Sequence, residues 1–353
     1  MEILETNAAD REDWTRFLYQ QPRSSVYATP EFIDFLSGVV PGRPRCFKLV
    51  EGGVIRGLLP AFMHEHNNFG RVLNSLPWYG SHGGCVIAEG DSEARRSLLA
   101  GYRRLLDQEE FSFAVLIPPL TEVDYSEDYD RLLQPLARDY RIGQVTQLPI
   151  SGDDDELALE RVLKQKTRNL VRKSRKQGFR RTLEENDESW NFLYEVHQEN
   201  MAAIGGKAKP MDHFESLRQS IPAEMRELAI AWLGDVPVAA LLLLRFNRTV
   251  EYFTPVVKQA YRSQQPMSFL IWHAMLDAML NDYRWWNWGG TWPSQESLHH
   301  FKAGWGATDI PYNYFIHGSS PSLVSLRTDP DAWAEQFPYY FLYPYNELQR
   351  GKT

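Results

Sequence analysis

The sequence predicts an α/β (α+β) protein with two domains in tandem, each a mixed, mostly antiparallel sheet flanked by helices. Three observations support this fold class. A length of 353 residues favours two domains of ordinary size over one. With 43% hydrophobic and 24% charged residues, each half has enough apolar surface to bury a core. Both halves also show nearly the same order of predicted elements, which indicates a repeat of topology.

A change in composition near Ser151 marks the predicted domain boundary. The turn-forming stretch LPISG, 148–152, is followed by four acidic residues and then by a basic block. We therefore expect an N-terminal domain over 1–150, a C-terminal catalytic domain over 151–320, and a C-terminal tail rich in Tyr and Pro over 321–353.

In the first half, apolar runs predict the strands and amphipathic runs predict the helices. Strands are expected at 2–4, 45–50, 55–62, 72–76 and 111–117, and helices at 11–19, 30–36 and 92–106.

Cap and turn residues define the elements of the second half. Gly178 ends one helix in a left-handed conformation, Asp187 caps the next, and Pro266 opens another. Gly234-Asp235 joins two apolar strands as a hairpin. Helices are expected at 157–177, 187–203, 212–220, 266–280 and 298–302, and strands at 179–184, 227–233, 236–246, 249–257, 284–288 and 311–317.

Composition excludes several classes of protein. A net charge of −8 argues against a protein that coats nucleic acid with its whole surface. The two cysteines, Cys46 and Cys85, are too few for a disulfide framework, and no metal-ligand spacing is present. The N-terminus lacks the apolar run of a signal peptide, and no apolar stretch is long enough for a transmembrane segment. We expect a cytoplasmic protein without a metal or a bound cofactor.

Three segments of the second half stand out in order. They are the basic run KQKTRNLVRKSRKQGF at 164–179, the run EYFTPVVKQAYRSQQPMSFLIWHAM at 251–275, and WNWGG followed by LHHFKAGWGA. Taken together, they resemble the Fem-type aminoacyltransferases of the GNAT acyltransferase superfamily. In the first half, PWYGSHGGCVI at 77–87 is similar to an aromatic-Tyr-Gly-Gly segment of that family. The resemblance covers about residues 5–317. It implies tandem GNAT-like domains and transfer of an amino acid from a charged tRNA to the amine of a cell-wall precursor peptide.

Lys302, in the run HFKAGWG, is the first candidate catalytic residue. It lies among apolar and glycine neighbours, where packing can hold its ammonium toward the negative charge that develops in acyl transfer. The alternative is a lysine that only extends from a short helix to solvent. His300 is a candidate to accept the proton of the attacking amine, although a packing role is the more common one for such a histidine.

The basic block at 161–181 contains ten Lys and Arg residues and no acidic residue, so it forms a local positive field. Such a field suits the phosphates of tRNA or of a nucleotide- or lipid-linked substrate. For most of the ten, a solvated helix face is the simpler interpretation. The resemblance singles out Arg168, Asn169 and Arg172 as substrate-binding candidates, and Lys173 is a donor-binding candidate.

The loop before Pro266 is the predicted donor site. Typical GNAT enzymes hold the pyrophosphate of coenzyme A on a glycine-rich turn at a helix N-terminus. The corresponding stretch here, 261–268, has no glycine, and Pro266 removes one N–H donor. This departure favours a bulkier donor than coenzyme A. The donor-binding candidates in this loop are Arg262, Ser263 and Gln264.

Aromatic residues and glycines near the last strands are candidates to bind the acceptor. Rings there can stack on a sugar or a peptide, although some of the tryptophans are expected in the core. The glycines of the first half indicate close approach of the backbone to a substrate. The substrate-binding candidates are Tyr252, Trp288, Gly289, Gly290 and Trp292 in the second half, and Tyr79 and His82 in the first.

Together these features predict an acyltransferase that forms an amide on an amine-bearing small molecule or peptide, with aminoacyl-tRNA as donor. One alternative keeps the fold but uses an acyl-CoA or carrier-protein thioester in surface-polysaccharide or natural-product synthesis. Another is a degenerate tandem fold that only binds a tRNA or a precursor. Binding of coenzyme A, compared with salt-dependent binding of charged tRNA, would separate these hypotheses.

Overall fold

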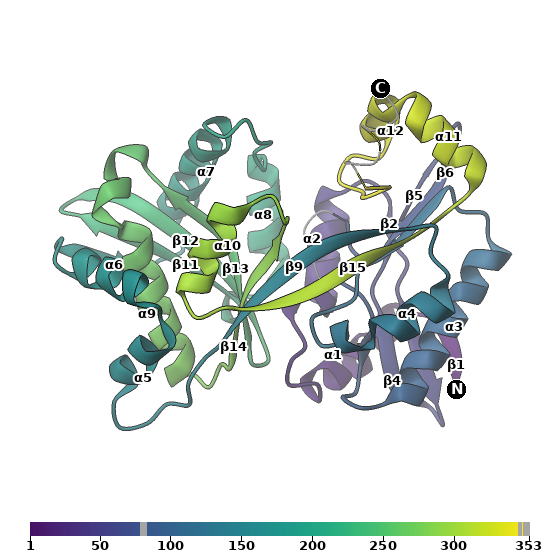
Figure 1. The fold of residues 1–353 in the computed structure, drawn as a ribbon, viewed down its shortest axis with the longest axis horizontal. Coiled ribbons are helices and arrows are strands. Elements are labelled where there is room, and N and C mark those ends of the chain that lie inside the picture. Colours follow the sequence, from purple (N-terminus) through teal and green to yellow (C-terminus); the bar gives the residue numbers. More distant parts are fainter. Residues whose placement is uncertain (78–82, 345–347, 349–353) are drawn as a thin grey trace. The chain divides into compact units, whose positions relative to one another are not determined.

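The computed structural model describes residues 1–77, 83–344 and 348 and divides the chain into two compact units (Figure 1). The first unit comprises Met1–Ile142 and Ile310–Thr353, and the second comprises Gly143–Asp309. Within residues 1–77, 83–344 and 348, no helix is long and apolar enough to cross a membrane.

The second unit is built on a mixed sheet in which one parallel pair interrupts antiparallel strands. Four consecutive antiparallel strands are followed by β14, which runs parallel to β13. The order is β10 (Phe179–Thr182), β11 (Arg226–Leu233), β12 (Val236–Phe246), β13 (Thr249–Val257), β14 (Trp285–Thr291) and β9 (Ala137–Gln147), of which the residues from Gly143 on belong to this unit. The predicted mixed, mostly antiparallel sheet is therefore confirmed for this unit.

Helices cover both faces of this sheet (Figure 1). The alternation of side chains along β11 sends Ala229 and Ala231 toward α9 (Pro266–Leu280), in the core that also contains Trp272. The neighbouring Leu228 and Ile230 are equally buried but point to the other face. That face is covered by α7 (Asp187–Ala202), whose capping residue is Asn186 and not the predicted Asp187. α8 (Met211–Ser220) packs against α7.

The predicted helix over 157–177 is two helices, α5 (Asp155–Val162) and α6 (Gln165–Arg175). Leu163 between them has an extended backbone and is buried in the core. Lys164 donates its backbone N–H to the carbonyl oxygen of Gly304 at 2.9 Å instead of to a carbonyl of its own helix. Burial of Leu163 therefore prevails over the helix propensity of the surrounding residues.

The first unit carries two small sheets. One has the order β1 (Glu2–Glu5), β3 (Phe47–Glu51), β4 (Val54–Leu59) and β7 (Val86–Ile87). In the other, β15 (Thr308–Gly318) is followed by β8 (Phe113–Leu116), β6 (Gly70–Asn74), β5 (Phe62–His66) and β2 (Arg43–Pro44). The single strand predicted at 55–62 is thus two strands in different sheets, because Pro60 has no N–H to continue a ladder.

The two units repeat one connection. In the first unit the parallel pair β6 and β8 is joined through α3 (Ser92–Gln108), and in the second the parallel pair β13 and β14 is joined through α9. The predicted repeat of topology is confirmed by this shared parallel step. The remaining helices of the first unit are α1 (Arg11–Tyr19), α2 (Pro30–Val39), α4 (Ser126–Leu133), α11 (Ser320–Thr328) and α12 (Pro330–Gln336).

Residues after 309 belong to the first unit, which differs from the predicted domains 151–320 and 321–353. β15 forms an antiparallel pair with β8, from Phe315 opposite Leu116 to Gly318 opposite Phe113. Trp333 of α12 then packs with ring centroids 4.9 Å from Phe69 and 5.3 Å from Phe113. Strand pairing and ring packing therefore join this segment to the N-terminal half, and local composition does not reveal such contacts.

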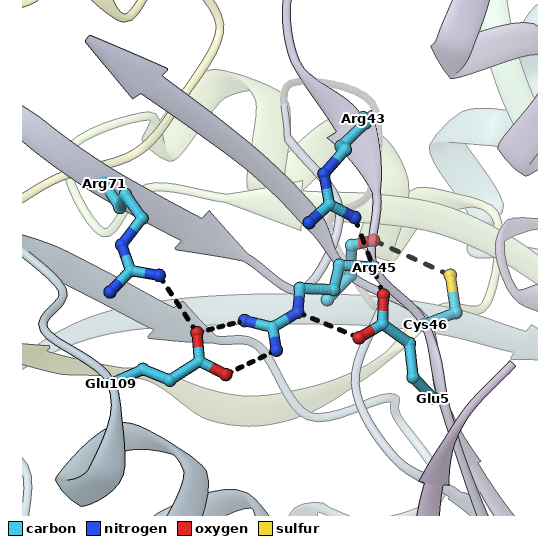
Figure 2. A network of polar contacts seen from close by, with 7 residues as sticks. Glu5, Arg43, Arg45, Cys46, Arg71 and Glu109 are labelled. Atoms are coloured by element: carbon cyan, nitrogen blue, oxygen red, sulfur yellow. Dashed lines mark hydrogen bonds and ion pairs between the residues drawn. The ribbon is translucent and has the colours of Figure 1, made fainter. Parts of the chain in front are cut away.

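A buried arginine, Arg45, lies at the centre of a network of ion pairs in the first unit (Figure 2). Arg45 donates two hydrogen bonds to the carboxylate of Glu109, at 2.7 and 2.5 Å, and one to Glu5 at 3.2 Å. Arg71 also binds Glu109, and Arg43 pairs with Glu5. Because the guanidinium is shielded from solvent and its hydrogen bonds are charge-assisted, this network contributes to the stability of the unit.

Candidate active site

Lys302 is a buried lysine in α10 (Glu296–Gly304), the helix that follows β14. Its Nζ donates a hydrogen bond to Oγ1 of Thr291 at 2.7 Å and two longer ones to the carbonyl oxygens of Gly290 and Gly289, at 3.3 and 3.4 Å. Burial lowers the pKa of Lys302 from its ordinary value to about 8. At neutral pH the ammonium therefore remains the main form, held at the end of a strand with one strong and two weak acceptors.

Two aromatic side chains on either side of Lys302 anchor α10. The ring centroids of Phe301 and Trp305 lie 6.0 and 6.2 Å from that of Trp288 on β14. Because residues four apart lie on one helix face, both rings pack against the same indole. This packing holds the helix, and with it the backbone of Lys302, against the sheet.

The two glycines of the run HFKAGWG allow close packing against α5 and α6. A Cβ atom on Gly304 would lie 2.4 Å from Oγ1 of Thr167, and one on Gly306 would lie 2.3 Å from Cγ1 of Val162. Gly306 also has a φ of +78°, which disfavours any other residue. These glycines therefore support the packing of α10 against α5 and α6.

Thr291 connects Lys302 to three further polar groups. Its hydroxyl lies 3.3 Å from Oε1 of Gln144, a fully buried residue of β9. Nε2 of Gln144 donates to Oδ1 of Asp309 at 3.1 Å and to the backbone oxygen of His299 at 3.3 Å. The ring of His299 in turn lies 2.8 Å from Oδ2 of Asp309. A continuous chain of hydrogen bonds thus runs from the buried ammonium to the partly exposed contact between His299 and Asp309.

The expectation that Trp288 faces a substrate surface is wrong. Its side chain is 3% exposed, and its Nε1 donates to the hydroxyl of Thr146 at 2.9 Å. The half-buried Tyr252 packs on it with ring centroids 4.9 Å apart, and burial raises the pKa of this tyrosine. Trp286 and Trp288 of β14 therefore belong to the core that supports α10.

The other candidates on and after β14 lie at its exposed end. Gly289 has a φ of +73°, and no other atom lies near the position that a Cβ would take. A glycine is therefore favoured here by the backbone conformation and not by the close approach of another group. Its carbonyl oxygen and that of Gly290 accept from Lys302. Trp292 is half-buried, and its backbone N–H donates to Oε1 of Gln295 at 3.1 Å. Of these three residues, only Gly289 and Gly290 contact the ammonium, through their carbonyl oxygens.

His300 does not face Lys302. It is exposed, and its Nδ1 lies 2.7 Å from the carbonyl oxygen of Glu296 in the first turn of its own helix. Residues two apart on a helix point to different sides, which separates His300 from the lysine side chain. The predicted role of His300 as proton acceptor therefore has no support in the contacts that the structure records.

The candidates on α6 are largely engaged with neighbouring residues. Arg168 donates to the carbonyl oxygens of Glu160 and Leu163, at 3.2 and 2.7 Å, and so caps the end of α5. Arg172 forms an ion pair with Glu160 at 2.8 Å, and Asn169 accepts from the side chain of Gln165 at 3.0 Å. These three residues thus hold α5 and α6 together or lie at the surface, and the prediction that they bind substrate stays a prediction.

A second face of α6 carries positive charge outside this set of ion pairs. Lys166, Lys173 and Lys176 are exposed, and within the described part of the chain no carboxylate forms an ion pair with them. Their spacing of seven and three places them on one side of the helix. The opposing α5 neutralises only Arg172 and Arg175, the latter through Glu156. The three lysines therefore form a positively charged patch on this side of α6.

The predicted donor loop forms a 3-10 helix, η5 (Gln259–Gln264), in front of α9. Arg262 and Ser263 are exposed and Gln264 is half-buried. Gln265 follows in a left-handed conformation, and its side chain does not cap α9. The first N–H groups of α9 thus have no side-chain cap from the preceding residue, and no glycine opens the turn.

The remaining candidates, Tyr79 and His82, lie outside the described residues. In the part of the chain that is described, no group of three or more His, Cys, Asp or Glu side chains is arranged to hold a metal ion.

Sequence reasoning missed Gln144, Thr291, Asp309 and the half-buried Lys209. Lys209 donates to Oγ1 of Thr254 at 2.9 Å and lies 4.7 Å from the ring centroid of Phe253, and burial lowers its pKa to about 8. It follows Gly205-Gly206, so the local sequence indicates a solvated loop. No local signal reveals Gln144 either, because its partners are distant in sequence.

Residues 161–303 match the family model of the acetyltransferase (GNAT) domain. No protein with a curated description matches the sequence of the chain. Among solved structures, FemX is similar with a TM-score of 0.72 at 13% identity, covering 92% of this chain and 99% of that one. The predicted resemblance to Fem-type proteins is thus confirmed at the level of the fold.

Two further structures share this fold. One is the C-terminal DUF2156 domain of a protein assigned as a lysylphosphatidylglycerol synthetase from Agrobacterium fabrum, with a TM-score of 0.58 at 14% identity. It covers 96% of this chain and 100% of its own length. The other is L-PGS from Bacillus licheniformis, with a TM-score of 0.52 at 12% identity over 93% of this chain and 97% of that one.

Proposed function

We propose that the chain is an acyltransferase that transfers an aminoacyl group to an amine, because residues 161–303 match the acetyltransferase (GNAT) domain and the fold is similar to that of FemX. The donor in this proposal is an aminoacyl-tRNA, and the acceptor is an amine on a cell-wall precursor peptide or a related molecule. The amine attacks the ester carbonyl, the carbon–oxygen bond to the ribose breaks, and the amine proton ends on the departing oxygen. The donor ester is already activated, so no covalent enzyme intermediate is needed.

The observation that carries the proposal is the ammonium of Lys302. Two of its three hydrogen bonds, to Gly290 and Gly289, are 3.3 and 3.4 Å long. Bonds of this length are weak, so these N–H groups can turn toward an oxyanion at small cost. Because the side chain is buried, a charge–charge attraction formed there is stronger than in water. Lys302 therefore suits stabilisation of the tetrahedral oxyanion, the catalytic role assigned to it in this proposal.

Two features support tRNA as the donor. The exposed cations Lys166, Lys173 and Lys176 form a face that suits a phosphate backbone. The loop before α9 has no glycine, and Pro266 at the start of the helix lacks an N–H, so the usual pyrophosphate cradle is incomplete. In this proposal Arg262, Ser263 and Gln264 contact the donor.

One observation favours the alternative, an acyl-CoA donor. The side chain of Gln265 makes no capping hydrogen bond to α9, so N–H groups of its first turn are available for an anion such as a pyrophosphate. The two donors differ in a simple way. Coenzyme A would bind in a saturable manner with little dependence on salt, whereas the affinity for tRNA would fall steeply with salt.

The test is a mass-spectrometric screen of aminoacyl-tRNAs and acyl-CoAs against cell-wall precursors, with wild type and Lys302→Met side by side. We expect amide product from a charged tRNA, and a loss of about 100-fold or more in turnover for the variant. Circular dichroism and thermal unfolding would show that the variant is folded. Turnover by Lys302→Met within a few-fold of wild type would contradict the assigned role. Product from acyl-CoA alone would select the alternative donor.

A further inference from the structure

The orientation of the Gln144 side chain is determined by its neighbours. Its Nε2 donates to Oδ1 of Asp309 at 3.1 Å and to the backbone oxygen of His299 at 3.3 Å. Both partners are acceptors, so the reverse orientation of the amide would place two pairs of oxygen atoms against each other. The carbonyl oxygen of Gln144 therefore faces Thr291, at 3.3 Å from its hydroxyl.

This orientation determines what the hydroxyl of Thr291 can do. An amide oxygen only accepts, so the single hydroxyl proton is donated to Gln144. An ammonium only donates, so the lone pairs of the same oxygen accept from Lys302 at 2.7 Å. A proton that turned toward Lys302 would repel the ammonium. Gln144 thus keeps Thr291 in the orientation in which it attracts Lys302.

We propose that Gln144 and Asp309 are positioning residues that hold the Lys302 ammonium, through Thr291, in the orientation the transfer reaction requires. This role rests on the proposed function of Lys302. Gln144 is fully buried and Asp309 is near the surface, so this series of hydrogen bonds joins the Lys302 ammonium to Asp309. Asp309 also contacts α10, through the ring of His299.

The same groups position the helix that carries the lysine. His299 lies one turn before Lys302 and contacts both positioning residues. Its backbone oxygen accepts from Gln144, and its ring lies 2.8 Å from Asp309. A helix held at His299 and an ammonium held at Thr291 leave the lysine side chain little freedom. Preorganised donors of this kind need no reorganisation when the oxyanion forms.

The test follows the Nζ signal of Lys302 by NMR in full-length protein labelled with ¹⁵N-lysine, so it does not depend on a substrate. The signal is assigned by its loss in Lys302→Met and titrated from about pH 6 to 10. Losing an acceptor disfavours the charged form, so the pKa must fall. We expect a decrease of about one unit in Thr291→Val and of at least about half a unit in Gln144→Met. Thr291→Ser should restore the wild-type value.

Thr146→Val is the matched control. It removes a buried hydroxyl from the same strand as Gln144, where Thr146 binds Trp288 and Trp305 but not Lys302. It should lower thermal stability and leave the Lys302 titration unchanged. If Gln144→Met changes the pKa of Lys302 no more than Thr146→Val does, the proposal is overturned.

A second pair of variants covers the case in which Gln144→Met does not fold. Asp309 is about half exposed, so its replacement is tolerable. Asp309→Asn keeps an acceptor for Gln144 but removes the charge, whereas Asp309→Ala removes both. A larger pKa decrease in Asp309→Ala than in Asp309→Asn supports the chain of hydrogen bonds. Equal decreases would show that only the charge of Asp309 acts, and would overturn the positioning role.

Activity gives an independent readout. If Gln144 acts through Lys302, Gln144→Met should lower kcat about tenfold with little change in KM, and have no further effect in the Lys302→Met background. Additive losses would contradict the proposal. A lack of any effect of Lys302→Met would instead contradict the proposed function, while the titration would still decide the positioning role.

Discussion

Nζ of Lys302 lies 2.7 Å from Oγ1 of Thr291, the last residue of β14. This contact brings a buried cation to the end of a strand, beside two carbonyl oxygens that accept it only weakly. A cation that is held by one strong bond and is free to redirect two others has the properties that oxyanion stabilisation requires.

The first prediction concerns the pH dependence of turnover. Because burial lowers the pKa of Lys302 to about 8, the ammonium is lost as pH rises through that value. We expect kcat to fall above about pH 8 in wild type, and the fall to move to higher pH in Lys302→Arg, whose side chain stays charged. Steady-state kinetics across this range would check it. An identical alkaline limb in both proteins would show that another group titrates.

The second prediction concerns stability. The folded-state pKa of Lys302 is lowered, so between about 8 and its ordinary value the unfolded chain binds more protons than the native one. The free energy of unfolding of wild type relative to Lys302→Met should therefore rise with pH in this window, by at most about 3 kcal/mol. Urea titrations at several pH values measure the slope. The exposed Lys166→Met serves as the control, which should show no such slope.

The third prediction concerns the basic face of α6. Lys166→Gln with Lys173→Gln should weaken binding of charged tRNA and reduce its salt slope by about one unit per lysine that contacts a phosphate. The matched pair Arg172→Gln with Arg175→Gln removes the same charge from residues that already pair with Glu160 and Glu156. Filter binding at several salt concentrations compares them. Equal changes in slope would show that this face has no special role.

The fourth prediction concerns the packing of α10. Gly304→Ala should destabilise the protein by about 1–3 kcal/mol, because its Cβ would lie 2.4 Å from Oγ1 of Thr167. Thr167→Ala removes that oxygen. The double variant should therefore lose less unfolding free energy than the sum of the losses in Gly304→Ala and in Thr167→Ala. Thermal and urea unfolding of the four proteins complete the cycle. Additivity would mean that the clash is relieved elsewhere.

Much of the layout could be predicted because it depends on local patterns. Gly234-Asp235, Pro266 and the apolar runs around them predict the strands and helices of the second unit, which the structure shows with small shifts of their ends. β9 was missed. Its stretch ARDYRIGQVTQ mixes charged and polar residues with apolar ones, so the alternation that indicates a strand is weak. With β9, the position of Gln144 was missed too.

The sequence by itself determined the tandem arrangement of elements and the choice of Lys302, since cap residues, periodicity and a short motif are properties of neighbouring residues. Only the tertiary structure decided that Trp288 lies in the core, that Gly304 and Gly306 serve packing, and that Gln144 forms hydrogen bonds with both Asp309 and Thr291. These contacts join residues far apart in the chain. Whether two such side chains meet depends on strand register and helix packing, which no local stretch of sequence specifies.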